Sequence, residues 1–136
     1  MRKIISICGS MQFFEEMKNL ELDLERFGYA VFLPQAEESE DDYSQLPENE
    51  KPVLKKKFID AHLRKIRESD AVLIANYPKR GIAGYIGANT LIEIAFAYAL
   101  NKPLFLLHQL AEQACKDEVD GLAATILHGN LSNISI

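Results

Sequence analysis

One acidic residue, Glu93, stands inside the most apolar helical stretch of the sequence and is the first candidate for chemistry. Its neighbours from Leu91 to Ala99 are almost all apolar, which predicts a helix that the fold covers nearly completely. A buried carboxylate is costly unless it has partners or a function. Thr90 and Glu93 also fit the capping-box pattern, in which the Glu side chain accepts from a backbone N–H. Both interpretations stay open, because the first helical turn stabilises an ionised carboxylate.

A glycine-punctuated loop comes directly before this helix. It follows the apolar run 71–75, which predicts a strand covered on both faces and ends at Asn76 and Tyr77. Ligands of open parallel sheets lie at the carboxyl ends of the strands. The loop glycines, of which Gly87 is the last, permit a ligand to approach the backbone closely. An ionised carboxylate beside such a loop suits glycosyl chemistry, in which an Asp or Glu meets an oxocarbenium-like transition state.

The pair Gly9–Ser10 is a second candidate site, because it joins a predicted strand over 3–8 to a predicted helix over 11–27. A helix N-terminus there would offer free N–H groups and the positive end of the helix dipole to an anion. The alternative is structural, with Gly9 making a tight turn and Ser10 capping the helix.

His62 is the third candidate. It falls inside the apolar stripe of a predicted helix over 53–69, whereas Asp60 falls outside that stripe. A histidine can exchange a proton near neutral pH, but a histidine packed into a helix stripe is an equally good interpretation.

The elements that must position these residues alternate along the chain. Further strands are predicted over 29–33, 103–107 and, briefly, 126–128, with helices over 89–101 and 111–124. The opening strand-helix-strand unit should be parallel and right-handed. We expect a three-layer α/β/α sandwich, flavodoxin-like or Rossmann-like, with a four- to five-stranded, mainly parallel sheet.

Length and composition bound the remaining expectations. With 136 residues and 48% apolar content, we expect a single domain over 1–136. The polar segment 35–52 carries seven carboxylates and predicts a mobile loop, either a solvated flap or a metal-binding cluster. Cys8 and Cys115 lack paired metal-ligand spacing, so we expect plain thiols and no metal.

The net charge of −5 argues against binding of a nucleic acid polymer but not of a small nucleotide. The sequence has neither an apolar run long enough to span a membrane nor a secretory leader pattern after Met1. We therefore expect a cytoplasmic protein without a membrane partner.

Three segments together resemble the nucleoside 2-deoxyribosyltransferase superfamily, which includes the deoxynucleoside-monophosphate N-glycosidases. These segments are 7–10, 68–75 and 87–103, and the resemblance covers roughly 3–107. It implies a retaining mechanism in which Glu93 attacks the anomeric carbon of a nucleoside or nucleotide. It also implies that no metal or cofactor is needed and that the chain forms a homodimer or larger homo-oligomer.

The resemblance also implies where the substrate binds. The segment around Gly9 matches the part of the family that meets the sugar or its 5′-phosphate, and Asn89 and Thr90 correspond by position to loops at the same end of the ligand. Tyr77 could stack on the base, although an aromatic side chain there is as often packing. The substrate-binding candidates are thus Cys8, Gly9, Ser10, Asn76, Tyr77, Gly87, Asn89 and Thr90.

Two departures from the family pattern bear on the chemistry. The family often has an Asp eight residues before the acid that opens the third strand, where this chain has His62, counted back from Asp70. His62 could still protonate the leaving base. The phosphate-cleaving branch follows Gly-Ser with a basic residue, where this chain has Met11, so the charge for a 5′-phosphate would have to come from Lys79 or Arg80.

A non-catalytic nucleotide-binding or sensor module is the alternative function, and the same two departures favour it. A dinucleotide-binding enzyme is disfavoured, because the turn after the first strand lacks the spaced glycines of that fingerprint.

Overall fold

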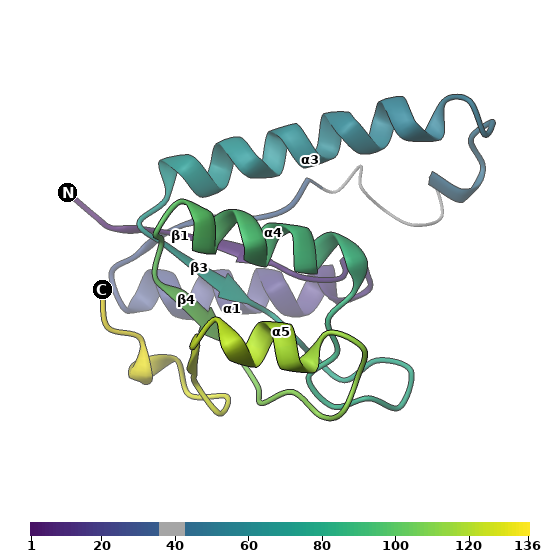
Figure 1. Cartoon of the computed structure of the whole chain (residues 1–136). Helices are drawn as coiled ribbons and strands as arrows, with labels where there is room; N and C mark the ends of the chain where they lie inside the picture. The colour runs from purple at the N-terminus through teal and green to yellow at the C-terminus, as the bar shows by residue number, and fades with distance from the viewer. Residues whose placement is uncertain (36–42) are drawn as a thin grey trace.

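The computed structural model describes residues 1–35 and 43–136, and contains a five-stranded, all-parallel sheet in the order β2-β1-β3-β4-β5 (Figure 1). The strands are β1 Ile4–Cys8, β2 Ala30–Phe32, β3 Ala71–Ile74, β4 Leu104–Leu106 and β5 Thr125–Ile126. The helices are α1 Phe14–Arg26, α3 Lys51–Glu68, α4 Ala88–Ala99 and α5 Lys116–Gly121, with 3-10 turns η1 Met11–Phe13 and η3 Leu131–Asn133. This α/β/α architecture confirms the predicted fold.

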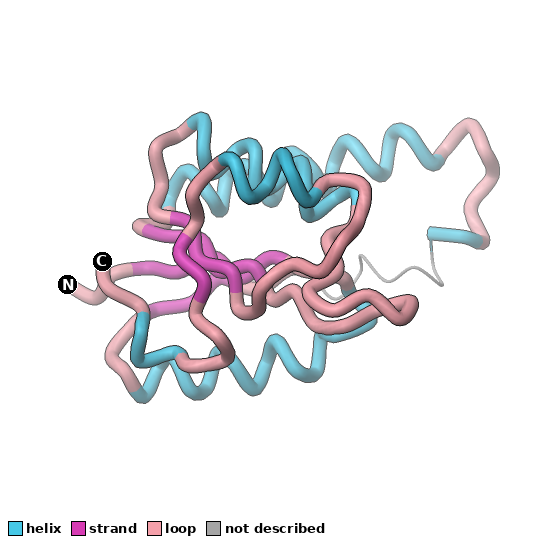
Figure 2. The backbone as a smooth tube through the Cα atoms, turned by 60° about the horizontal axis from the view of Figure 1, so that its bottom comes forward, coloured by secondary structure: helices cyan, strands magenta, loops and turns pink. Residues whose placement is uncertain are grey.

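The sheet has helices on both faces (Figure 2). On one face α1 and the C-terminal segment cover an apolar cluster that includes Ile7, Leu24 and Leu127. On the other face α3, α4 and α5 cover a second cluster that includes Cys8 and Ile94. Successive strand residues point to opposite faces, so the neighbours Ile7 and Cys8 belong to different clusters.

The carboxyl ends of β1 and β3 meet at the sheet edge that carries the predicted loops. Cys8 is in register with Ile74, and the Ala75 N–H donates to the Cys8 carbonyl at 2.8 Å. All four residues of β3 are buried, as the short apolar run predicts.

Polar contacts connect α3 to β1 and to the residue after β2. Ser6 Oγ donates to the Lys65 carbonyl at 3.2 Å, and Lys65 Nζ donates to the Leu33 carbonyl at 2.6 Å. None of the helices in the described ranges is long and apolar enough to cross a membrane.

The acidic segment is shorter than expected. The predicted loop over 35–52 ends early, because α3 begins at Lys51, with Pro52 in its first turn, where a proline is compatible with a helix. Glu48 pairs with Lys51 at 2.8 Å. Five of the seven carboxylates fall within 36–42, so the expected flap or metal cluster lies largely outside the described residues.

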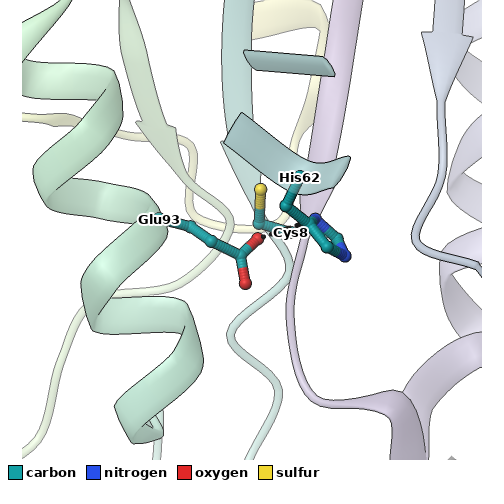
Figure 3. A group of neighbouring side chains, drawn as sticks. All are labelled: Cys8, His62 and Glu93. Carbon is teal, nitrogen blue, oxygen red and sulfur yellow. Dashed lines mark ion pairs between the residues drawn. The ribbon is translucent and has the colours of Figure 1, made fainter. Parts of the chain in front are cut away.

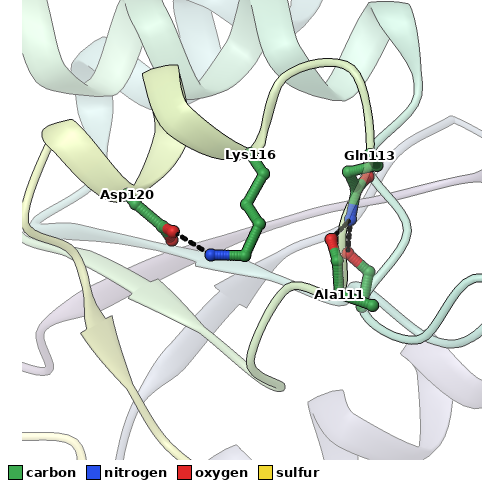
Figure 4. Close-up of polar contacts among 5 residues, drawn as sticks. Ala111, Gln113, Lys116 and Asp120 are labelled. Atoms are coloured by element: carbon green, nitrogen blue, oxygen red, sulfur yellow. Dashed lines mark hydrogen bonds and ion pairs between the residues drawn. The ribbon is translucent and has the colours of Figure 1, made fainter.

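The last helix is also shorter than expected, since α5 covers only 116–121 of the predicted 111–124. Gln113 is the reason (Figure 4). Its amide donates to the carbonyls of Gly84 and Ala111, and its side-chain oxygen accepts from the Ile86 N–H. These contacts hold the chain before α5 against the glycine loop, where a helix would remove them.

Candidate active site

A cavity of about 620 Å³ opens between α3 and α4, above the carboxyl end of β1. Its size is within the range of small-molecule sites. Both catalytic candidates, His62 and Glu93, line it, as do five of the predicted binding residues. Those five are Gly9, Ser10, Gly87, Asn89 and Thr90.

The side chains of Glu93 and His62 point toward one another (Figure 3), and both line this cavity. Glu93 Oε2 lies 3.2 Å from His62 Nδ1, and the two side chains are only 10% and 8% exposed. The contact is an ion pair when His62 is protonated, but Oε2 accepts no hydrogen bond from the described residues. A buried carboxylate oxygen without a hydrogen bond is costly, so Glu93 lowers the stability of the fold at this position.

The capping-box interpretation of Glu93 is wrong. α4 begins at Ala88, its N-cap is Gly87, and no side chain caps the helix. Glu93 therefore lies in the second turn, beyond the backbone N–H groups that a capping Glu reaches. The helix starts earlier than the Thr90 pattern suggests, and Glu93 lines the cavity.

Gly9 and Ser10 have the structural role considered for them, a tight turn and a helix cap. A Cβ on Gly9 would lie 3.0 Å from the Ala75 carbonyl oxygen, so the tight turn beside β3 favours glycine. Ser10 Oγ accepts from the Gln12 N–H at 3.4 Å as the cap of η1. It also accepts from Lys79 Nζ at 2.9 Å, across 69 residues of sequence.

The expected anion site at the start of α1 is not formed. The turn η1 separates Ser10 from α1, and the first turn of α1 carries Glu15 and Glu16. These carboxylates already complement the positive end of the helix.

The positive charge of the cavity comes from the glycine loop and α3 instead. Lys79 and Ile82 pair through two backbone hydrogen bonds, with Arg80 and Gly81 at positive φ of 54° and 73° in the turn between them. Such values are typical of a type I′ turn. The turn places Lys79 and Arg80 on the cavity, and Glu93 is the only carboxylate among its described lining residues.

Sequence reasoning missed several lining residues, notably Lys55, Phe58, Tyr85 and Phe96. Helical spacing could have found three of them. Lys55 and Phe58 lie seven and four positions before His62, and Phe96 lies three positions after Glu93, so each shares a helix face with a catalytic candidate.

Three predicted binding residues are absent from the described lining of the cavity. Asn76 instead joins β3 to the loop after β4, donating to the His108 carbonyl at 2.7 Å and accepting from the His108 N–H at 2.9 Å. Tyr77 packs on the α1 side of the sheet, 5.3 Å from the Phe13 ring, and burial raises the pKa of its hydroxyl. Base stacking by Tyr77 is therefore not supported. Cys8 is the third.

Cys8 is buried beside the catalytic candidates, and its Sγ belongs to a group of ligand atoms from Cys8, His62 and Glu93 that all lie within 4.8 Å of one another. Asp60 is exposed and pairs with Lys56 at 2.6 Å, which confirms its place off the stripe.

Comparisons with known proteins bear on the fold and the family. No curated protein sequence matches the chain. Among solved structures, the chain is similar to the CMP N-glycosidase BcmB of Clostridium botulinum, with 19% identity and a TM-score of 0.53 over 91% of this chain and 85% of that one. It is also similar to a 2-deoxyribosyltransferase of Bacillus psychrosaccharolyticus, with 20% identity and a TM-score of 0.51 over 82% and 76% of the two chains.

At such low identities these structural likenesses establish the fold alone. The family relationship comes from the sequence, because the model of the nucleoside 2-deoxyribosyltransferase family matches residues 7–127. That span runs from β1, through α3 with His62 and α4 with Glu93, to the residue after β5. The chain therefore belongs to the nucleoside 2-deoxyribosyltransferase family.

Proposed function

We propose that this protein cleaves or transfers the N-glycosidic bond of a nucleoside monophosphate, with Glu93 as the nucleophile. Family membership and the two solved relatives support activity on such bonds. The observation that carries the proposal is Glu93 itself, which is buried, lines the cavity and has one oxygen without a hydrogen bond from the described residues.

In the first step, a Glu93 oxygen attacks the anomeric carbon as the bond from that carbon to the base nitrogen breaks. The bonding electrons leave with the base, and protonated His62 supplies the proton that neutralises it. The sugar is left as an ester of Glu93. His62 is suitably placed for both tasks, because it lines the cavity and contacts the carboxylate at 3.2 Å.

In the second step, water or a second base attacks the same carbon and displaces Glu93. Neutral His62 accepts the proton that the attacking group loses. Two displacements at one carbon retain its configuration. Retention at the anomeric carbon is therefore part of the proposal.

A 5′-phosphate fits the charged part of the cavity. Lys55, Lys79 and Arg80 line it in a chain whose net charge is −5. The N-terminus of α4 also opens on it, without a capping side chain or an acidic residue in its first turn. Free N–H groups and cations together are typical of phosphate sites. The cavity is also lined by the aromatic side chains of Phe58, Tyr85 and Phe96. We propose that these rings pack on the sugar and base.

The first experiment follows release of free base. We would incubate the protein with 2′-deoxynucleosides, ribonucleosides and their monophosphates, with and without a second base, and separate the products by chromatography. Base release that falls on the order of a thousandfold in Glu93→Gln supports the enzyme. The matched control is Glu118→Gln, because Glu118 is exposed and absent from the described cavity lining.

The same assay separates the enzyme from the sensor module. A ligand that raises the melting temperature while no substrate of the panel releases base would favour the sensor. A sugar ester on the peptide that contains Glu93, found by mass spectrometry after acid quenching, would support the nucleophile specifically. Full activity in Glu93→Gln would overturn the mechanism.

The phosphate proposal has its own test. Replacing Lys79 by Met should lower kcat/KM for monophosphates by roughly ten- to a hundredfold, which is the value of one charge-assisted hydrogen bond. Activity on the unphosphorylated nucleoside should change little. Lys57→Met is the control, because Lys57 is exposed on the same protein but absent from the described lining. Equal losses on both substrates would contradict a phosphate contact.

Three broader expectations also stay proposals: one domain, a cytoplasmic location and a homodimer or larger homo-oligomer. The oligomer is the most accessible of them. Light scattering behind size exclusion should give at least twice the 15.3 kDa chain mass, and a monomer would contradict it.

A further inference from the structure

We propose that Cys8, His62 and Glu93 form a three-ligand site for a soft divalent cation, with Zn²⁺ as the preferred ion, and that its occupation blocks Glu93. Binding of the ion stands on the geometry of these side chains alone, whereas the block rests on the proposed function.

The three ligands come from three elements that meet at one point (Figure 3). Cys8 ends β1, His62 lies in α3, and Glu93 lies in α4. One ligand atom from each lies within 4.8 Å of the other two, and His62 Nδ1 and Glu93 Oε2 are 3.2 Å apart. Tetrahedral zinc needs ligand atoms roughly 3.5 Å apart, so small side-chain movements complete the site.

Burial supplies a second, independent observation. The three residues are 1%, 6% and 8% exposed, in chain order, and Glu93 Oε2 accepts no hydrogen bond from the described residues. A bound cation would satisfy that oxygen. A buried carboxylate that points toward a thiol and an imidazole can therefore share a metal ion with them, in addition to attacking a substrate.

The donor set selects the ion. Thiolate sulfur and imidazole nitrogen with one carboxylate oxygen suit Zn²⁺, whereas Mg²⁺ and Ca²⁺ prefer oxygen ligands alone. Binding replaces the thiol proton of Cys8 by the metal and releases that proton to solvent, and it requires neutral His62. Affinity should therefore rise with pH. Three protein ligands leave a fourth position, which water can occupy.

Occupation of this site and glycosyl transfer exclude one another in the proposed mechanism. A Glu93 oxygen bound to Zn²⁺ cannot attack the anomeric carbon, and metal-bound His62 cannot carry a proton to the base. Zinc should thus act as a reversible inhibitor that a chelator removes.

Cobalt gives a direct readout on the intact protein. Adding Co²⁺ to the metal-free, reduced chain should produce an intense thiolate-to-Co²⁺ charge-transfer band, which Zn²⁺ then abolishes by displacement. The chain has two cysteines, so Cys115→Ser identifies the ligand without altering the site. Retention of the band in Cys115→Ser supports Cys8. Absence of the band from the unmodified protein, or its loss in Cys115→Ser, overturns the proposal.

Competition with a chromophoric chelator then measures zinc affinity. Cys8→Ser and His62→Gln should each weaken it at least about tenfold, whereas the exposed His128→Gln should leave it unchanged. Circular dichroism checks that each variant is folded. If Cys8→Ser does not fold, the cobalt spectra of the unmodified chain and of Cys115→Ser still decide. Unchanged affinity in folded Cys8→Ser and His62→Gln overturns the site.

Base release measured with Zn²⁺ and with chelator separates this proposal from the proposed function. Release that Zn²⁺ suppresses and chelator restores supports both. If the protein binds zinc but releases no base from any substrate, the metal-site proposal stands and the proposed enzymatic function is rejected. If saturating Zn²⁺ leaves base release unchanged, the proposed inhibition of Glu93 by zinc is wrong, while the proposed glycosidase activity is retained.

Discussion

The two faces of the sheet differ in what they bury. The α1 face covers an apolar cluster, with Leu24 in α1 and Leu127 after β5 both fully buried. The α3–α4 face is also apolar over most of its area, but at the carboxyl end of β1 it buries His62 and Glu93 beside Cys8. The described residues of the first face therefore form a mainly apolar core, and the other face combines a core with a polar cavity.

This difference shows where the fold accepts a cost. Apolar burial stabilises by roughly 25 cal/mol per Å², whereas a buried polar atom without a hydrogen bond costs about 1–3 kcal/mol. Substitutions on the α1 face should change stability and leave the chemistry per folded molecule intact. Substitutions of the polar group on the other face should do the reverse.

The largest expected effect is on the α1 face. Leu24→Ala should lower the free energy of unfolding by about 2–5 kcal/mol, because it leaves a cavity in a closed core. Urea denaturation measures the loss. Leu22→Ala on the same helix is the control, because Leu22 is 54% exposed, and it should be nearly neutral. If base release per folded molecule also fell in Leu24→Ala, the division between the faces would be wrong.

The glycine loop provides the next effect. Gly84 has a φ of 64°, and a Cβ there would overlap the carbonyl oxygen of Gln109. Gly84→Ala should destabilise by more than the roughly 1 kcal/mol that left-handed backbone costs an alanine. Gly81→Ala isolates that backbone cost, since Gly81 has a φ of 73° and open space around it.

Thermal unfolding of the two variants measures the difference between them. Gly84→Ala should also reduce base release, because the same loop carries Lys79 into the cavity. Equal melting temperatures for the two variants would show that the loop moves away from Gln109 without cost.

Glu93 gives a smaller effect of opposite sign. Glu93→Gln should raise the free energy of unfolding by about 1 kcal/mol, because a neutral amide is cheaper to bury than a carboxylate with an unsatisfied oxygen. Chemical denaturation at neutral pH, with Glu118→Gln as the control, measures the gain. A clear loss of stability would mean that Glu93 supports the fold, and would weaken its assignment as a group kept for reaction.

The smallest effect concerns pH. Burial, with a smaller contribution from His128, lowers the pKa of His108 below its ordinary value near 6.5. The native state then resists protonation more than the unfolded chain does, so this contribution to stability is full above pH 6.5 and is lost as pH falls through the lowered pKa. In His108→Gln, the free energy of unfolding should fall less as pH drops below 6.5. If it falls as steeply as in the unmodified protein, other groups cause the loss of stability in acid.

The sequence alone determined the elements and their order, because short bounded apolar runs and helical stripes report local burial. It placed β3 within one residue, put His62 in the apolar stripe of α3, and set Glu93 in a helix. The expectation that the fold covers this helix nearly completely was wrong, because six of the twelve residues of α4 are exposed, including Ile92 and Tyr98. It failed at helix ends, where a long-range contact or a shifted start overrides a local pattern. Gln113 shortens α5, and the earlier start of α4 removes the capping box.

Tertiary structure alone decided the site. Which face a residue occupies depends on strand pairing and helix packing, so only the fold sends Tyr77 to the α1 side and leaves Asn76 joining two strand ends. Only the fold brings Lys79 to Ser10 across 69 residues, and Cys8 to His62 and Glu93. Residue type and spacing record what a segment can bury, whereas the meeting of separate segments is set by how β1, α3 and α4 pack together.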